Sequence, residues 1–191
     1  MSGVVAQRRA QPNGWWGVLL LIGTEAALFG ALIASYFYLR FNAKAWPPPG
    51  VAAPEVLKPS LMTAVLVATS IPIVIASRGA AAGALGRARA GLGIALIVQC
   101  AYLVVQIDDF SSELAKHDAR GSAYSSIYYT LLGAHHFHVL IGVLLSAGIL
   151  FKLRNGLTNY RTIGVRSIAL YWLFTNAVAV AVLLTQLYPA L

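Results

Sequence analysis

Five long apolar segments, each almost free of charged side chains, dominate this sequence. They cover roughly residues 15–39, 60–77, 90–107, 124–151 and 167–187. About 20 apolar residues in a helix span the roughly 30 Å hydrocarbon layer of a bilayer. Lipid tolerates only helices and closed barrels, and none of the segments alternates with the period of two that a barrel strand requires. The segments therefore predict five transmembrane helices.

The composition agrees with a membrane protein. Hydrophobic residues make up 59% of the 191 residues and charged residues only 10%, whereas a soluble domain carries about 25% charged residues. We expect an all-α membrane protein with one domain over residues 15–191, a bundle of five transmembrane helices, after a short cytoplasmic segment at residues 1–14. The net charge of +8 comes from scattered Lys and Arg rather than a basic run, so no nucleic-acid partner is expected.

The connections between the segments differ in charge, and this difference predicts the orientation. With the N-terminus inside, nine basic residues lie in the inner connections: Arg8, Arg9, Arg78, Arg87, Arg89, Lys152, Arg154, Arg161 and Arg166. Five lie in the outer ones: Arg40, Lys44, Lys58, Lys116 and Arg120. Because Lys and Arg are in excess on the cytoplasmic side of membrane proteins, we expect a cytoplasmic N-terminus and a C-terminus outside.

Glu25 is the one acidic residue inside an apolar segment. It lies ten residues beyond Trp15, which is about 15 Å along a helix. A carboxyl group at that depth is unfavourable in lipid and is a functional candidate, as a proton-handling group or a polar anchor. The structural alternative is a protonated acid that is hydrogen-bonded to a backbone carbonyl.

Three histidines lie in the fourth segment, within the sequence HHFH at 135–138. His135 and His138 are three residues apart and share one helical face, whereas His136 points elsewhere. The first and fourth segments run antiparallel, so Glu25 and this pair lie at similar depth. A carboxyl–imidazole contact would lower the cost of burying both groups. We therefore expect Glu25 to hydrogen-bond, directly or through water, to His135 or His138.

A metal site and a transporter are the alternatives to this interpretation. Two histidines and a distant glutamate can bind zinc or iron, but a bundle with a metal centre usually supplies ligands from several helices. The other histidine, His117, lies in an outer connection, and the single cysteine, Cys100, lies in an apolar segment. We therefore expect no metal in this chain. A small proton-coupled transporter with Glu25 as relay is the alternative of another class, although five segments leave no inverted repeat.

Local features predict how the helices pack. Pro72 predicts a kink in the second segment, and the polar residues 108–121 suggest a short amphipathic helix on the membrane surface. Small residues predict close contacts between helices, at positions that include Gly23, Gly30, Gly91, Gly93 and Gly142.

Four stretches carry a wider resemblance. They are GTEAALFG at 23–30 with ASYFYLR at 34–40, WPPPG at 46–50, YYTLLGAHHFHVLIG at 128–142, and YWLF at 171–174. Together they resemble the subunit III family of cytochrome c oxidases, from about Trp15 onward. The family's seven-helix members have two further helices at the start. The family usually has a histidine and an acid where this chain has Leu173 and Asn176.

The resemblance implies a non-catalytic subunit III of a bacterial aa3- or caa3-type cytochrome c oxidase in the inner (plasma) membrane. Haem and copper would lie in its partners, subunits I and II, and cytochrome c would be met only through the complex. The chain would stabilise the catalytic subunit, bind phospholipid and support proton uptake in aerobic respiration. The equivalent subunit of a quinol oxidase or nitric oxide reductase is the alternative.

The resemblance also implies roles for single residues. Glu25 and His138 would line a lipid cleft, and Lys152 would meet the lipid phosphate near the inner surface. His135 completes this set of lipid-binding or proton-related candidates. For Lys152, an ordinary basic residue of the inner surface is the alternative.

Overall fold

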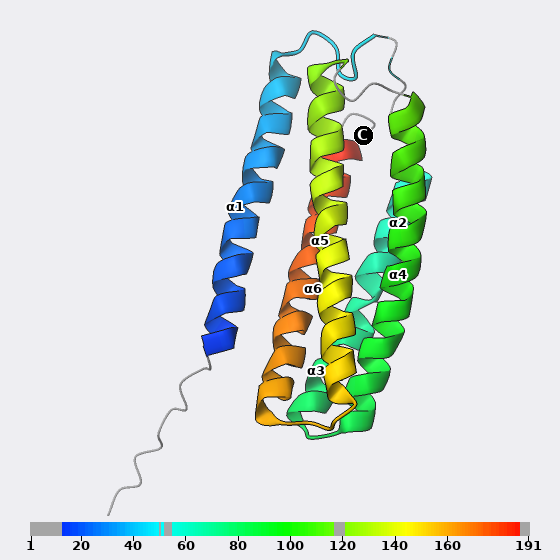
Figure 1. Cartoon of the computed structure of the whole chain (residues 1–191). Helices are drawn as coiled ribbons and strands as arrows, with labels where there is room; N and C mark the ends of the chain where they lie inside the picture. The colour runs from blue at the N-terminus through cyan, green and yellow to red at the C-terminus, as the bar shows by residue number, and fades with distance from the viewer. Residues whose placement is uncertain (1–12, 50, 52–54, 117–120, 188–191) are drawn as a thin grey trace, which may run out of the picture.

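The computed structural model describes residues 13–49, 51, 55–116 and 121–187, and within these ranges it is helical without a strand. The helices are α1 (Asn13–Asn42), α2 (Leu57–Ala68), α3 (Ser70–Ala81), α4 (Leu85–Lys116), α5 (Ala123–Leu153) and α6 (Asn159–Leu187). Helices α2 and α3 follow one another end to end (Figure 1), so the six helices provide five that are long and apolar enough to cross a membrane. This confirms the predicted class. Of the predicted N-terminal segment, residues 1–12 lie outside the described residues, as do residues 188–191 at the C-terminus.

The break between α2 and α3 lies at Thr69, three residues before Pro72. Proline has no backbone N–H, and its ring clashes with the carbonyl four residues earlier, so a helix cannot pass through it unperturbed. The Thr69 hydroxyl donates to the Leu66 carbonyl at 2.6 Å. The same hydroxyl oxygen accepts a hydrogen bond from Gln99 Nε2 of α4 at 3.2 Å. The predicted kink is present, and a side chain from a neighbouring helix contacts it.

Helix α4 is longer than the sequence suggested. Residues 108–116 continue α4 instead of forming a separate helix on the membrane surface, so that prediction is wrong for this part; residues 117–120 lie outside the described residues. No glycine or proline interrupts the chain between Ile107 and Lys116. Lys58 at the start of α2 also makes an ion pair with Asp109 at 2.6 Å. The extension is thus tied to α2.

The two ends of the bundle differ in charge. One end, which we call the basic end, holds the α3–α4 and α5–α6 connections (Figure 1), with Arg78, Arg87, Arg89, Lys152, Arg154, Arg161 and Arg166 in or near them. The opposite end, the acidic end, holds Glu55, Asp108, Asp109 and Glu113. The charge difference that predicted the orientation therefore separates the two ends of the bundle.

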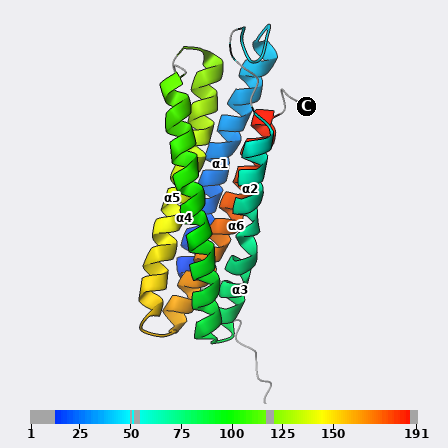
Figure 2. The ribbon, with the colours of Figure 1, turned by 90° about the vertical axis from the view of Figure 1, so that its right-hand side faces the viewer.

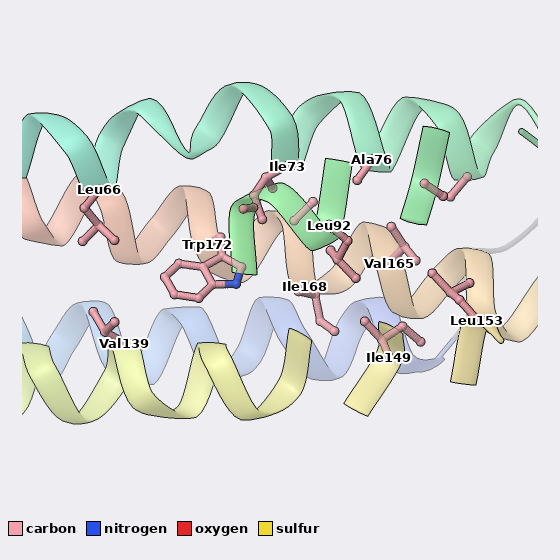
Figure 3. Packing of buried hydrophobic residues seen from close by; sticks show 14 of the residues in the cluster. Leu66, Ile73, Ala76, Leu92, Val139, Ile149, Leu153, Val165, Ile168 and Trp172 are labelled. Atoms are coloured by element: carbon pink, nitrogen blue, oxygen red, sulfur yellow. The ribbon is translucent and has the colours of Figure 1, made fainter. Parts of the chain in front are cut away.

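The apolar core lies between α2, α3, α4, α5 and α6 (Figure 3). Trp172 of α6 is fully buried at its centre, near Ile73 and Val139, and its Nε1 donates to Ser146 Oγ at 2.8 Å. Gly142 allows this arrangement, because a Cβ atom there would lie 2.7 Å from the Trp172 ring. A large aromatic side chain thus fills the space that a glycine leaves on the neighbouring helix.

Helix α1 lies at the edge of the bundle (Figure 1). Its only buried residues are Phe29 and Tyr36, both in the half nearer the acidic end. The predicted close packing at Gly23 and Gly30 is wrong for the described part of the chain, because no atom of another described helix comes within 4 Å of a Cβ placed at either position. The half of α1 nearer the basic end therefore has no fully buried residue, although Glu25 contacts α5 and Trp15 contacts Arg166 of α6.

Candidate functional site

Glu25 of α1 and His138 of α5 meet near the middle of the bundle. Glu25 Oε2 lies 2.7 Å from His138 Nε2. Glu25 is twelve residues into α1 and His138 is fifteen residues into α5, which are about 18 and 22 Å along the two antiparallel helices. The side chains are 21% and 9% exposed, respectively. The expected carboxyl–imidazole contact is thus present as a direct hydrogen bond.

The other ring nitrogen of His138 determines where the proton of this pair can lie. His138 Nδ1 is 2.7 Å from the Ala134 carbonyl oxygen, which can only accept, so Nδ1 carries a hydrogen. One further hydrogen then lies between Nε2 and Glu25. On the carboxyl group it gives two neutral side chains, and on the imidazole it gives an ion pair. The pair has no net charge in either form, which reduces its cost in an apolar environment.

Neighbouring aromatic residues hold His138 in position. Phe29, one turn beyond Glu25 on α1, packs its ring against the imidazole with the ring centroids 5.1 Å apart. Tyr171 of α6 donates its hydroxyl hydrogen to the backbone carbonyl of His138 at 2.9 Å. Three helices therefore fix the position of this histidine, whereas Glu25 reaches it from the loosely packed α1.

His135 does not take part in the contact with Glu25. It is 2% exposed, and neither ring nitrogen has a hydrogen-bond partner among the described residues. Its ring lies 5.9 Å from that of His136, measured between centroids. Of the two histidines that could have met Glu25, only His138 does so.

His136 faces α4, as expected for a residue on a different side of α5. Its Nε2 is 3.2 Å from Gln106 Nε2, and Phe110 packs edge-on against its ring. These side chains help to line a hollow of about 590 Å³ at the acidic end, which the Lys58–Asp109 ion pair also borders. The sequence analysis did not single out this hollow. Gln106, an amide in an otherwise apolar stretch, was the available signal.

Lys152 is not part of the Glu25–His138 contact. It is exposed in the last turn of α5, fourteen residues after His138, which is about 21 Å along the helix. Fourteen residues are close to four whole turns, so Lys152 lies on nearly the same face of α5 as His138. The lysine is thus at the basic end, below the pair and on the same side of the helix.

The described residues contain no cluster of three or more His, Cys, Asp and Glu side chains that could hold a metal ion. The acid–imidazole pair offers a chemistry of its own. It can hold, release or accept a proton, and it can hydrogen-bond a polar group that enters beside α1. These properties define a class of protein: a multi-pass membrane protein with a hydrogen-bonded acid–imidazole pair at its edge.

Comparisons with known proteins identify the family. The family profile described as "Cytochrome c oxidase subunit III" matches residues 9–189. Cytochrome c oxidase subunit 3 of Thermostichus vulcanus is 27% identical over 90% of this chain and 85% of its own length. Cytochrome bo(3) ubiquinol oxidase subunit 3 of Pseudomonas aeruginosa is 28% identical over 89% of this chain and 82% of its own length.

A third relative has a different organisation. The "Heme-copper oxidase subunit I+III" of Aeropyrum pernix is 29% identical over 80% of this chain, which spans 20% of that protein.

The chain belongs to the cytochrome c oxidase subunit III family. It is thus subunit III of a haem-copper oxidase, a membrane complex that it forms with other subunits of the oxidase.

Proposed function

We propose that this chain is the accessory subunit III of a bacterial aa3- or caa3-type cytochrome c oxidase. In this proposal it contacts subunits I and II, which hold haem and copper, and it meets cytochrome c only through the complex. It stabilises the catalytic subunit, binds phospholipid and supports proton uptake. The name of the Thermostichus vulcanus relative supports cytochrome c as the electron donor.

A quinol-oxidising complex is the second candidate, because the ubiquinol oxidase relative has a similar identity to this chain. The purified complex distinguishes the two. We expect it to oxidise reduced cytochrome c and to leave ubiquinol unoxidised. Oxidation of ubiquinol alone would assign the chain to the second class, while its place in the family would stand.

The Glu25–His138 pair is the observation on which the proton-related part of the proposal rests. An acid and an imidazole that share one hydrogen at mid-depth, 2.7 Å apart, can pass a proton between a polar group at α1 and the bundle. A purely structural contact between α1 and α5 would not need two ionisable groups. Ionisable residues inside a membrane are functional candidates for this reason.

The surroundings of the pair support the lipid-related part. Helix α1 has no buried residue between Asn13 and Leu28, so its half near the basic end is open to contact with lipid or a partner subunit. Lys152 lies at that end, on nearly the same face of α5 as His138. An acyl chain along α1 and α5, with its phosphate near Lys152, matches this arrangement of apolar and basic groups.

Replacing Glu25 with Gln tests the proton-related role. The amide keeps the shape and can still donate a hydrogen bond to His138, but it cannot exchange a proton. We expect the oxidase to assemble with all subunits and to begin turnover normally, but to lose activity within fewer turnovers. Glu55→Gln, the same change at an exposed acid, is the control. Unaltered turnover and inactivation kinetics for Glu25→Gln would remove the proton-related role.

Replacing Lys152 with Ala tests the lipid-related role. We expect less phospholipid to remain on the purified complex in native mass spectrometry. Arg87→Ala removes a positive charge from an exposed residue at the same end of the bundle and serves as the control. Equal lipid retention in both variants and the unmodified complex would exclude Lys152 as a phosphate contact.

We further propose that the chain lies in the bacterial inner membrane with the basic end toward the cytoplasm. The charge difference between the ends supports this orientation. Single cysteines can test it in a Cys100→Ala background, one replacing Arg87 at the basic end and one replacing Glu55 at the acidic end. A membrane-impermeant maleimide added to spheroplasts should label only the cysteine at position 55. Labelling of position 87 alone would show that the chain has the opposite orientation.

A further inference from the structure

A groove with basic and apolar walls lies between α4 and α5 at the basic end. It is an open groove with a volume of about 530 Å³, lined by Arg89 and Leu96 of α4, by Ala147, Leu150 and Phe151 of α5, and by Arg154, which follows α5 directly. The two helices run side by side to this end of the bundle (Figure 2). The groove is remote from Glu25 and His138, so it is a separate feature of the molecule.

The basic wall is built from two arginines with no acid near them. Arg89 donates from Nη2 and Nε to the Leu153 carbonyl, at 2.7 and 3.3 Å. These bonds fix its guanidinium group, while Nη1 makes no hydrogen bond within the described part of the chain. The Arg154 guanidinium lies over the Phe151 ring, 5.7 Å from its centroid. Both positive charges border the same hollow, and none of the carboxylates that the structure describes lies at this end of the bundle.

The apolar wall begins where the charges end. Leu96 is seven residues beyond Arg89 on α4, and Ala147 is seven residues before Arg154 on α5. Seven residues are about 10 Å along a helix, so both walls extend about that far from the arginines toward the middle of the bundle. The small side chain of Ala147 keeps the groove open. This arrangement suits a molecule with a negative charge at one end and an apolar chain at the other.

We propose that this groove binds an anionic phospholipid, with its phosphate held by Arg89 and Arg154 and one acyl chain along Leu96, Ala147 and Leu150. Arginine suits a phosphate because its planar group offers several donors in a fixed geometry. The position of the arginines at the end of membrane-spanning helices matches the level of lipid head groups. A free phosphate ion would use the arginines but leave the apolar wall without a role.

This site differs from the one proposed at Lys152. Lys152 precedes Arg154 by two residues, which is about 200° around a helix, so the two basic side chains lie on opposite sides of α5. The groove therefore adds a second lipid contact to the subunit. It does not depend on the Glu25–His138 pair, and Lys152→Ala should leave it intact.

The test is a titration of the delipidated, detergent-solubilised oxidase with phosphatidylglycerol, followed by native mass spectrometry. Arg154→Gln removes one charge, and Ala147→Trp fills the groove without changing charge. We expect Arg154→Gln to weaken one bound phosphatidylglycerol about fivefold, since one basic residue near an anionic lipid contributes about that factor. Ala147→Trp should weaken the same lipid because the indole occupies the place of the acyl chain. Phosphatidylcholine should bind the unmodified complex more weakly than phosphatidylglycerol does.

Two matched variants control for charge and bulk. Arg87→Gln removes a charge at the same end but outside the groove, and Leu145→Trp places the same final side chain on the other side of α5. Both should bind phosphatidylglycerol normally. The proposal is overturned if Arg154→Gln and Ala147→Trp bind as these controls do. It is also overturned if inorganic phosphate displaces the lipid from Arg154 and Ala147→Trp has no effect, because the site would then hold a free anion only.

Discussion

Helices α3 and α4 touch at Gly91, and this contact gives a direct test of the packing. A Cβ atom at Gly91 would lie 2.5 Å from the Pro72 carbonyl oxygen and 2.9 Å from the Ala76 backbone nitrogen. Ordinary van der Waals contacts of a Cβ begin at 3.4 Å. Both obstructing atoms belong to the backbone, so no side chain can rotate away. The two helices would have to move apart by most of an ångström to admit Ala.

Gly93 provides the comparison that isolates this effect. It lies two residues further along α4, and no described atom lies within 4 Å of a Cβ placed there. Ala is favoured over Gly in a helix by about 1 kcal/mol, and this gain applies at both positions. Overpacking costs about 1–3 kcal/mol, and it applies only at Gly91. The stabilities of Gly91→Ala and Gly93→Ala should therefore differ by about 1–3 kcal/mol.

The assay is stepwise heating of the purified oxidase, with retention of subunit III on the complex followed by native electrophoresis. We expect Gly91→Ala to be released at a lower temperature than the unmodified subunit. Gly93→Ala should be released at the same temperature or a higher one. Equal midpoints for the two variants, or a higher one for Gly91→Ala, would refute the contact between α4 and the backbone of α3.

Three further predictions concern contacts in the same core and use the same release assay. At Gly142→Ala, overpacking should cost about 1–3 kcal/mol, offset by the gain of about 1 kcal/mol that Ala brings in a helix. Adding Trp172→Phe should remove much of the overpacking cost, so strictly additive effects of the two changes would contradict the contact. Asn176→Ala and Ser70→Ala should each cost about 1 kcal/mol and little more together, because one 2.8 Å hydrogen bond joins the two residues. Arg89→Gln should lower the release temperature, since hydrogen bonds from a charged donor contribute about 1.5–3 kcal/mol. An unchanged temperature would show that the hydrogen bonds from Arg89 to the Leu153 carbonyl do not stabilise the subunit.

The five spans and the Glu25–His138 contact could be predicted because strong physical terms fix them. Uncharged segments of this length have few alternatives in a bilayer. An acid and an imidazole at the same depth lower their cost by meeting. Depth follows from residue number alone, at 1.5 Å per residue. The choice between His135 and His138 does not follow from residue number, because it depends on how each helix is rotated about its axis.

Details that depend on helix rotation and contact were not predictable in the same way. Gly91 and Gly142 each lie in close contact with a neighbouring helix, whereas a Cβ placed at Gly23, Gly30 or Gly93 would meet no neighbouring helix. The sequence shows a glycine in an apolar segment in all five cases. A small residue permits close approach without saying which side of the helix the neighbour lies on. The extension of α4 was missed for a related reason. Its polar residues form the end of a long membrane-spanning helix. A hydropathy pattern does not distinguish such a polar helix end from a separate helix on the membrane surface.

The two departures from the usual family pattern in the last helix are explained by where they lie. Leu173 is 40% exposed on α6 and faces outward, where an apolar side chain suits lipid or a partner subunit. Asn176 is buried and donates to Ser70 Oγ at the start of α3. A neutral amide can satisfy this hydroxyl without placing a charge in the core. Neither change touches the Glu25–His138 pair.

Two kinds of polar pair join helices near the middle of the bundle, and the difference between them supports the proposed proton-related role for one of them. The pairs inside the core, Asn176 with Ser70 and Trp172 with Ser146, join neutral side chains between well-packed helices. The pair formed by Glu25 and His138 joins two ionisable side chains at α1, which packs least closely. Neutral groups suffice to join helices, so an ionisable pair at the most accessible edge needs another reason. We propose exchange of a proton with a polar group beside α1 as that reason.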